Sequence, residues 1–257
     1  MLRRHRLEYL YGCVGADITQ AKKYTRAQQA HCHSWEVGWA LLDRARSDAQ
    51  RAFAWGYLTH LAGDVYSHNH FVPTQMVVSY RGRGMRHVYW EARFDVLQPN
   101  PPRAVIRELR DHEFPACDRL VEEVVARTLF SFKMDKRIFD SFIAVHDLDQ
   151  WHRIIARISQ RSRHAFPLEL VEQYNAACGA SVVDLFQQAR DAACQRADPT
   201  GFRALEQAKR VRATLRTLMR RGRITPGLEA RLSAMDEKRD LELPCCQPLS
   251  KASADDA

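Results

Sequence analysis

The sequence contains no long hydrophobic run and has little glycine or proline. No segment approaches the roughly 18 apolar residues that a membrane-spanning helix needs. Glycine numbers 11 and proline 10 among 257 residues, and no alternating strand pattern bounded by turn residues occurs. A hydrophobic content of 46% and a charged content of 27% are typical of a globular protein with a core. These features argue against a membrane-spanning chain and against a β-sheet protein.

Cysteine is sparse and poorly spaced for a structural role. The count of seven is odd, and no C-x-x-C spacing occurs. Both features argue against a disulfide framework and against a thiolate zinc site. We therefore expect reduced and mostly buried thiols. The cysteines are Cys13, Cys32, Cys117, Cys178, Cys194, Cys245 and Cys246.

Positive charge is in excess. The formal net charge is +8 and the pI is about 9.3. A basic surface favours anionic partners, either phospholipid head groups or nucleic acid, without distinguishing them. Net charge says nothing about oligomeric state.

The beginning of the chain, "MLRRHRLEYLYGCVGAD", is basic at its front. Glu8 and Asp17 leave too short and too polar a segment for a secretory signal. We therefore expect a cytoplasmic protein as the sequence is written. A start that lies upstream would instead make the protein secreted or periplasmic.

Apolar residues recur at helical spacing along the chain. Ser34 can begin a helix that runs to about residue 46, and Ser47 can begin the next, which runs to about His68. Asn69 and Pro73 are the expected terminators of that second helix. More helices are predicted at about 85–97, in four segments between 104 and 159, at 167–196 and at 200–221. The sequence thus predicts an all-α fold.

The predicted domain covers residues 1–238. Its last part, residues 200–238, is a basic helical extension, which follows a break at the Asp198–Pro199–Thr200 sequence. Residues 239–257, which include "CCQPLSKASADDA", are predicted to be a disordered tail.

Histidine is concentrated in one part of the chain. Six of the eleven histidines fall between residues 31 and 87. His60 and Asp64 are four residues apart and so share one helix face, and His87 and Glu91 repeat this spacing. Such pairs can direct two ligands at one ion from a rigid backbone. One His-x3-Asp alone is more often a surface ion pair, but the combination predicts a metal site. The mixed nitrogen and oxygen donors suit zinc better than manganese or iron.

The pattern resembles the zinc-dependent phospholipase C family, whose phospholipase C/D domain is distantly similar to the S1/P1 nucleases. The family order H-x3-D-x5-H followed by H-x3-E stands here as His60-x3-Asp64-x5-His70 and His87-x3-Glu91. Upstream, "YGCVGADI" supplies an aspartate and "HCH" supplies a histidine. The resemblance covers residues 8–97. It implies a multi-helix phospholipase C/P1 nuclease-like bundle around a zinc cluster of two or three ions.

The resemblance also implies a set of ligands. One zinc would be held by Asp17, by His31 or His33, by His60 and by Asp64. A second zinc would be held by His70, His87 and Glu91, and Asp64 could extend toward a third ion. His68 and Asp95 would support the ligands from behind, and His33 and His68 are alternative ligands.

One departure from the family lies at the front of the chain. The secreted enzymes hold a third zinc with their N-terminal residue, usually tryptophan, and an early histidine. Here sixteen residues precede Asp17, and His5 lies too close to it to fill that role. Three explanations stay open: a start upstream, a protein with two metals, or a protein without activity.

The resemblance implies a metal-dependent phosphodiester hydrolase. It would cleave a glycerophospholipid with zinc-activated water, and Asp17 is the expected catalytic residue that accepts the proton of that water. Two alternatives remain: a nuclease of the S1/P1 type, and an inactive zinc-stabilised binding module. Glu91 in place of aspartate favours the phospholipase branch slightly, so a membrane surface is the expected partner and nucleic acid is less favoured.

Two further segments have two interpretations each. The apolar residues at 71–80 could border a lipid cleft, but core packing is preferred. The basic helix at 209–223 could lie on anionic lipid or follow a phosphate backbone. The preferred interpretation is a helix that packs through an apolar stripe, consisting of Ala208, Val211, Leu215 and Leu218, and exposes a solvated basic face.

Overall fold

The structure is a computed structural model, and it describes residues 1–18, 31–82, 87–98, 103–125, 132–146 and 168–237, together with Arg153, Arg157 and Phe166. Every secondary-structure element in these residues is a helix, which confirms the predicted all-α fold. The predicted helix at 149–159 and the predicted disordered tail at 239–257 lie outside the described residues, apart from the two arginines.

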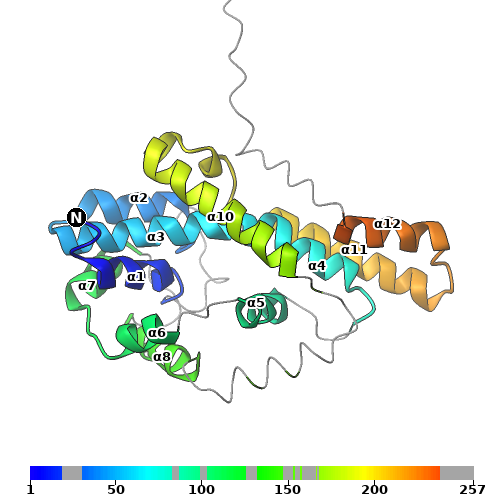
Figure 1. The fold of residues 1–257 in the computed structure, drawn as a ribbon, viewed down its shortest axis with the longest axis horizontal. Helices are drawn as coiled ribbons and strands as arrows, with labels where there is room; N and C mark the ends of the chain where they lie inside the picture. The colour runs from blue at the N-terminus through cyan, green and yellow to red at the C-terminus, as the bar shows by residue number, and fades with distance from the viewer. Residues whose placement is uncertain are drawn as a thin grey trace, which may run out of the picture.

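The helices follow one another without strands between them in the described ranges (Figure 1). The first half contains α1 (Arg6–Gly15), α2 (Trp35–Arg44), α3 (Asp48–Tyr66), the π-helix η3 (Ser67–Phe71), α4 (Val72–Val78) and α5 (His87–Val96). The second half contains α6 (Arg103–Arg110), α7 (Pro115–Val124), α8 (Phe132–His146), α10 (Leu168–Gln188), the 3₁₀ turns η4 (Ala189–Asp191) and η5 (Ala193–Arg196), α11 (Phe202–Arg220) and α12 (Pro226–Glu237).

The predicted beginnings of α2 and α3 are confirmed. The hydroxyl of Ser34 accepts a hydrogen bond from the backbone N–H of Val37 at 3.2 Å. The hydroxyl of Ser47 accepts one from the N–H of Gln50, also at 3.2 Å. Each hydroxyl satisfies one of the N–H groups that the first turn of a helix leaves without a partner, so these helix starts are set locally.

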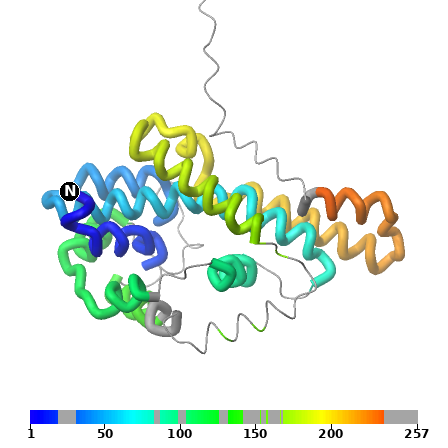
Figure 2. The backbone as a smooth tube through the Cα atoms, in the orientation of Figure 1, coloured from blue at the N-terminus to red at the C-terminus, as the bar shows by residue number. Residues whose placement is uncertain are grey.

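The predicted end of this second helix at Asn69 and Pro73 is wrong. The chain continues from α3 through the π-helix η3 into α4, and Figure 2 shows the three as one continuous tube. Pro73 is the second residue of α4 and follows directly on the π-turn, so it lies where the regular α-helical hydrogen-bond pattern is already interrupted. The Asn69 side chain donates to the carbonyls of Val65 at 2.9 Å and Asp198 at 2.8 Å, so it joins the π-turn to a distant segment.

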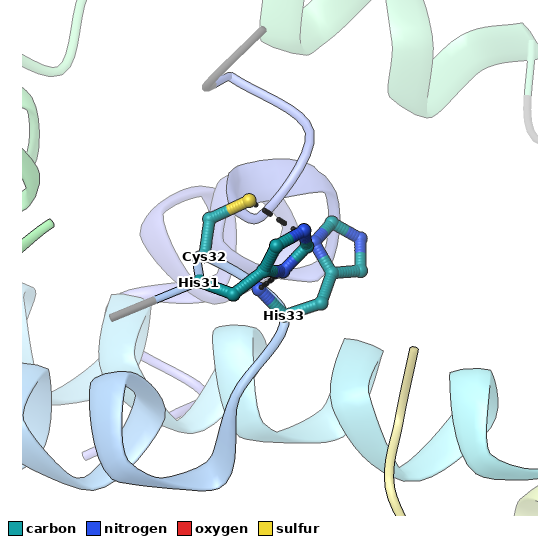
Figure 3. Close-up of side chains that lie close together, drawn as sticks. All are labelled: His31, Cys32 and His33. Atoms are coloured by element: carbon teal, nitrogen blue, oxygen red, sulfur yellow. Dashed lines mark hydrogen bonds between the residues drawn. The ribbon is translucent and has the colours of Figure 1, made fainter. Parts of the chain in front are cut away.

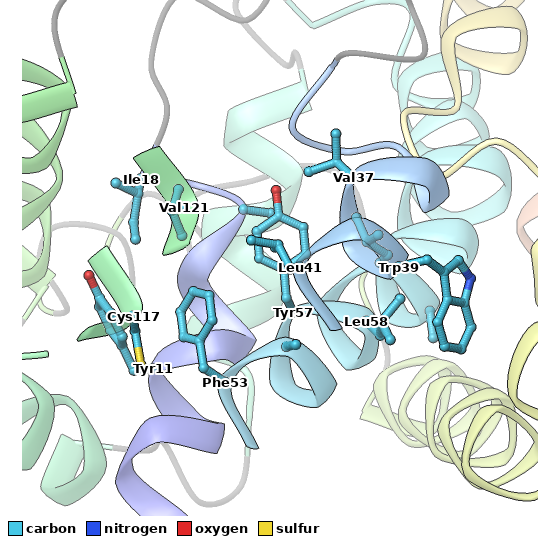
Figure 4. Close-up of a cluster of buried hydrophobic side chains, with 14 of the residues drawn as sticks. Tyr11, Ile18, Val37, Trp39, Leu41, Phe53, Tyr57, Leu58, Cys117 and Val121 are labelled. Carbon is cyan, nitrogen blue, oxygen red and sulfur yellow. The ribbon is translucent and has the colours of Figure 1, made fainter. Parts of the chain in front are cut away.

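The core of the molecule is centred on α3. Its fully buried Phe53, Tyr57 and Leu58 pack among side chains from α1, α2 and α7, as Figure 4 shows for residues such as Tyr11 and Leu41. Aromatic rings fill much of this volume, and Tyr11 stacks on Phe114 with the ring centroids 4.2 Å apart. Phe53 and Tyr57 lie on the same side of α3 as the histidines, so their packing holds the histidine row in a fixed position.

Two glycines allow α1 to lie directly against α3. A Cβ on Gly12 would overlap the carbonyl oxygen of Phe53, and a Cβ on Gly56 would overlap the carbonyl oxygen of Tyr9. The two backbones therefore touch where the helices cross, which only residues without a side chain permit.

Substituting alanine for Gly12 or Gly56 should therefore lower the free energy of unfolding by about 2–3 kcal/mol, because the helices must separate. Chemical denaturation measures the effect. Gly63→Ala is the matched control, because Gly63 lies on the same helix α3 and a Cβ there meets nothing within 4 Å. It should stabilise the helix by up to about 1 kcal/mol. An equal change in the free energy of unfolding for Gly56→Ala and Gly63→Ala would contradict the close contact between α1 and α3.

The apolar segment 71–80 packs in a second core, which confirms the preferred interpretation. Phe71, Val72, Met76, Val77 and Tyr80 are all buried there. They contact buried residues of α5, α10, α11 and α12, including Trp90, Leu170, Leu205 and Leu232. These side chains hold α4 and α11 together and do not line an open approach surface.

The long helix predicted at 167–196 ends earlier, at Gln188. Ala189 has a φ of +49°, which an α-helix cannot contain. The carboxylate of Asp184 accepts a hydrogen bond from the N–H of Ala193 at 2.8 Å and stabilises the 3₁₀ turns that follow. The predicted break at 198–200 is confirmed, because α10 and its turns end before it and α11 begins after it.

In α11 the packed stripe consists of Leu205, Ala208 and Leu215. The predicted stripe is wrong in one position. Val211 is 37% exposed, and the neighbouring Arg212 is buried in its place. Arg212 is accommodated because its guanidinium donates to the carbonyl of Gly82 at 2.6 Å.

Two further expectations concern cysteines and membranes. The five described cysteines form no disulfide with one another, and Cys32, Cys117 and Cys194 are buried. Among the described residues, no helix combines the length and apolar character needed to cross a bilayer.

Candidate metal centre

Helix α3 and the π-turn after it place three polar side chains on one face. His60, Asp64 and His68 follow one another at intervals of four residues, so they stack one turn above the next. The Asp64 Oδ2 atom lies 3.2 Å from His60 Nε2 and 3.8 Å from His68 Nδ1. Asp64 is thus the central group of the row, and its side chain is only 15% exposed.

A first group of possible ligands forms at the His60 end of this row. His33, from the turn before α2, brings its Nε2 atom to 3.2 Å from His60 Nε2 and 3.3 Å from Asp64 Oδ2. The same His33 atom lies 3.5 Å from Oδ1 of Asp17, which follows α1. Asp17, His33 and His60 are close enough together to hold a metal ion. Four side chains from three separate segments therefore converge here.

A second group forms at the His68 end. Helix α5 contributes His87 and Glu91, four residues apart as expected. Glu91 Oε1 lies 2.7 Å from His87 Nε2 and 3.1 Å from His68 Nε2. These three residues could also hold an ion. Two nitrogens and one carboxylate are a donor set that zinc accepts.

The donors of the two groups fit a divalent cation. Oδ2 of Asp64 is buried and makes no hydrogen bond, although three imidazole nitrogens surround it. A buried carboxylate oxygen without a hydrogen bond is costly unless a charge compensates it. The approach of the two Nε2 atoms of His33 and His60 likewise requires a shared proton or a shared cation between them. A zinc ion would satisfy both requirements.

The histidines are oriented from behind by backbone carbonyls. His60 Nδ1 lies 2.9 Å from the carbonyl of Cys13, and His68 Nδ1 lies 2.8 Å from the carbonyl of Pro199. A carbonyl can only accept a hydrogen bond, so each imidazole carries its proton on Nδ1 and presents Nε2 to the centre. This is the arrangement that metal-binding histidines use.

His33, not His31, faces the first group. Figure 3 shows both rings beside Cys32, in the turn that precedes α2. His31 Nδ1 accepts a hydrogen bond from the backbone N–H of His33 at 3.0 Å, and Cys32 Sγ lies 3.2 Å from His33 Nδ1. The three residues are close enough to form another group of possible ligands. Cys32 was not among the predicted ligands, because the chain contains no C-x-x-C spacing.

His70 and Asp95 occupy other positions. His70 lies against the ring of Tyr66, with centroids 6.0 Å apart, and belongs to none of the three groups found among the described residues. His68 stands in the group where His70 was expected. Asp95 lies near Glu91, and burial together with that negative charge raises the pKa of Asp95 to about 6.

The acidic groups are held ionised by the histidines. Burial alone would raise the pKa of Asp64, but His60, His68 and His33 lower it well below its ordinary range. Burial would likewise raise the pKa of Glu91, but the hydrogen bonds and charges of His68 and His87 have the larger effect and lower its pKa to about 2. Burial would lower the pKa of His68, but Asp64 and Glu91 raise it to about 9. Without metal, His68 is therefore protonated at neutral pH.

These shifts predict how the stability of the metal-free protein depends on pH. The pKa of Glu91 falls from 4.5 to about 2 on folding, so its contribution is complete above pH 4.5 and is lost as the pH falls toward 2. The pKa of His68 rises from 6.5 to about 9, so its contribution is complete below pH 6.5 and is lost as the pH rises through 9.

Chemical denaturation of the metal-free protein should therefore show stability lost as the pH falls from 4.5 toward 2, and lost again as it rises from 6.5 through 9. The zinc-loaded protein is the control, because bound zinc replaces the imidazole protons and should gain stability as the pH rises from 6.5 to 9. A metal-free protein that gains stability over that same interval would contradict the ion pairs of His68.

The loop before α11 supports the centre, a role that no motif in the sequence indicated. The Pro199 carbonyl of this loop accepts a hydrogen bond from His68, and the Asp198 carbonyl accepts one from Asn69. The loop also contains Gly201, which has a φ of +56°. A Cβ on Gly201 would overlap the backbone of His68. Gly201 before a predicted helix is visible in the sequence, but its contact with the distant His68 is not.

The comparisons with known proteins give one match. A family model described as "Zinc dependent phospholipase C" matches residues 1–160. This range contains both groups of possible ligands and ends before the loop that supports His68. No curated protein and no solved structure matches the chain.

Proposed function

The chain belongs to the zinc-dependent phospholipase C family, and from this premise we propose that it cleaves a glycerophospholipid at its phosphodiester bond. Diacylglycerol and a phosphorylated head group would be the products. Membership of the family and the groups of possible ligands support the broader statement that this is a metal-dependent hydrolase with zinc as its cofactor.

One observation carries the proposal. The two groups of ligands adjoin each other along a single helix face, since His68 lies 3.8 Å from Asp64 on one side and 3.1 Å from Glu91 on the other. One zinc would be held by Asp17, His33, His60 and Asp64, and a second by His68, His87 and Glu91. Adjoining sites suit a phosphodiester, which has an attacking and a leaving oxygen to stabilise.

Zinc, when bound, would lower the pKa of a water molecule and neutralise charge on the phosphoryl oxygens. The side chains have different parts in this chemistry. Asp64 is buried and surrounded by imidazoles, so its role is to hold charge in place. Asp17 is 52% exposed and lies 3.5 Å from His33 Nε2. It is therefore the carboxylate that can accept a proton from water at the centre and pass it to solvent.

Side-by-side assays of the zinc-loaded protein on phosphatidylcholine vesicles and on single-stranded DNA test the proposal. We expect release of phosphocholine and intact DNA. Asp17→Asn should lower the rate at least about a hundredfold, even at zinc concentrations that restore full occupancy, if Asp17 accepts the proton. Shortened DNA with intact lipid would instead make the protein an S1/P1-type nuclease. If the zinc-loaded protein cleaves neither substrate, it is a zinc-stabilised binding module.

A further inference from the structure

Helix α11 exposes a row of cations, which we call the basic face. The apolar stripe of the helix packs against α4 and the second core. On the other side of the helix and at its C-terminal end, the exposed cations are Arg203, Lys209, Arg210, Arg220, Arg221 and Arg223.

The charge of the basic face is almost uncompensated. Between Gln207 and Leu228 the chain contains seven cations and no acid. Lys209 pairs with Glu206 at 2.6 Å, and Arg212 is buried against the carbonyl of Gly82. The guanidinium groups of the five exposed arginines make no ion pair with any residue in the described ranges. Repulsion between neighbouring cations is relieved when an anionic surface covers them.

The basic face begins beside the metal centre. Gly201 packs against the backbone of His68, and Pro199 accepts the hydrogen bond from His68 Nδ1. The next residue, Phe202, is the first of α11, and its side chain is 60% exposed. An exposed aromatic ring and the first arginine of the row therefore follow directly on the loop that supports the second group of ligands.

We propose that the basic face of α11 docks on an anionic phospholipid surface, with Phe202 at the interface. Cations near an anionic bilayer are attracted by its surface potential, and an apolar ring beside them can enter the head-group layer. The helix has 19 residues and is therefore about 28 Å long, a straight row suited to a flat surface. Phe202 is the one aromatic residue of α11, so successive bases of a nucleic acid would find no series of rings to stack on.

Cosedimentation with vesicles tests this docking, and the zinc-loaded protein carries Asp17→Asn throughout so that slow hydrolysis leaves the vesicle lipid intact. The vesicles are pure phosphatidylcholine, or phosphatidylcholine with a quarter phosphatidylglycerol. Each cation near an anionic surface strengthens binding by about fivefold. The double variant Arg210→Ala/Arg221→Ala should therefore bind the anionic vesicles roughly 25-fold more weakly. Arg119→Ala/Arg137→Ala is the matched control, because it removes the same charge from exposed positions on α7 and α8.

The expected result is strong binding to anionic vesicles only, a loss in the α11 variant, and little change in the control. Phe202→Ala should weaken binding without changing its dependence on salt. Equal binding to neutral and anionic vesicles, or an equal loss in both double variants, would overturn the proposal. Binding to duplex DNA that survives excess anionic vesicles would also overturn it. The assay measures binding alone, so its failure is distinguishable from a failure of the proposed hydrolysis.

Discussion

Replacing Asp64 with alanine should remove both bound zinc and turnover. Oδ2 of Asp64 is buried, makes no hydrogen bond, and lies within 3.8 Å of nitrogens of three histidines, so its loss leaves both ends of the row without their central carboxylate. Removing a residue that supports a ligand already costs about 10–100-fold in metal affinity. Removing the central carboxylate should cost at least about 100-fold. Zinc content after dialysis and phosphocholine release measure the two effects.

Asp118→Asn provides the matched control. Asp118 is a partly buried aspartate of α7 that accepts a hydrogen bond from Tyr11, and it belongs to none of the groups of possible ligands. This variant should be less stable than the wild type but should keep its zinc. An Asp64→Ala protein with the zinc content of the wild type would contradict the central position of Asp64.

The second large effect is expected from Gly201→Ala. A Cβ at this position would overlap the carbonyl group of His68, so either the loop or the π-turn must move. Movement of the loop would take the Pro199 carbonyl away from His68 Nδ1, which fixes the ring orientation. We therefore expect zinc affinity at the second group to fall by about 10–100-fold, as it does when other such supports are lost. Titration with cobalt, followed by its visible absorption, measures this affinity.

Gly222→Ala separates this effect from backbone strain. Gly222 has a φ of +63°, close to the +56° of Gly201, but a Cβ there meets nothing within 4 Å. Both variants should lose about 1 kcal/mol of stability from the left-handed backbone. Only Gly201→Ala should also lose metal affinity and shift the ¹⁵N resonances of the His68 ring. Equal metal affinity in the two variants would contradict the role of the loop.

The parts of the fold that depend on local interactions were predictable. Ser34 and Ser47 begin helices because a side-chain oxygen accepts a nearby backbone N–H, and both residues are visible in the sequence. The pairing of His60 with Asp64 and of His87 with Glu91 follows from a spacing of four residues. The end of α10 at Gln188 was not predictable, because it depends on how Asp184 and the following turns pack.

The choice between His68 and His70 shows what spacing alone does not decide. The family order points to His70, and His70 could turn inward if the helix ended before it. The helix instead continues through the π-turn, which keeps His68 one turn beyond Asp64 and places His70 against Tyr66. A π-turn has no clear sequence signature. The carbonyl of Pro199 that fixes His68 lies 131 residues away, beyond the reach of any local pattern.

The central claim is that Asp17, His33, His60, Asp64, His68, His87 and Glu91 form one zinc centre. Crystals of the zinc-loaded protein, measured on both sides of the zinc absorption edge, test it most directly. We expect anomalous peaks in two places: one enclosed by Asp17, His33, His60 and Asp64, and one enclosed by His68, His87 and Glu91. Peaks only elsewhere in the molecule, or none at all, would contradict the claim.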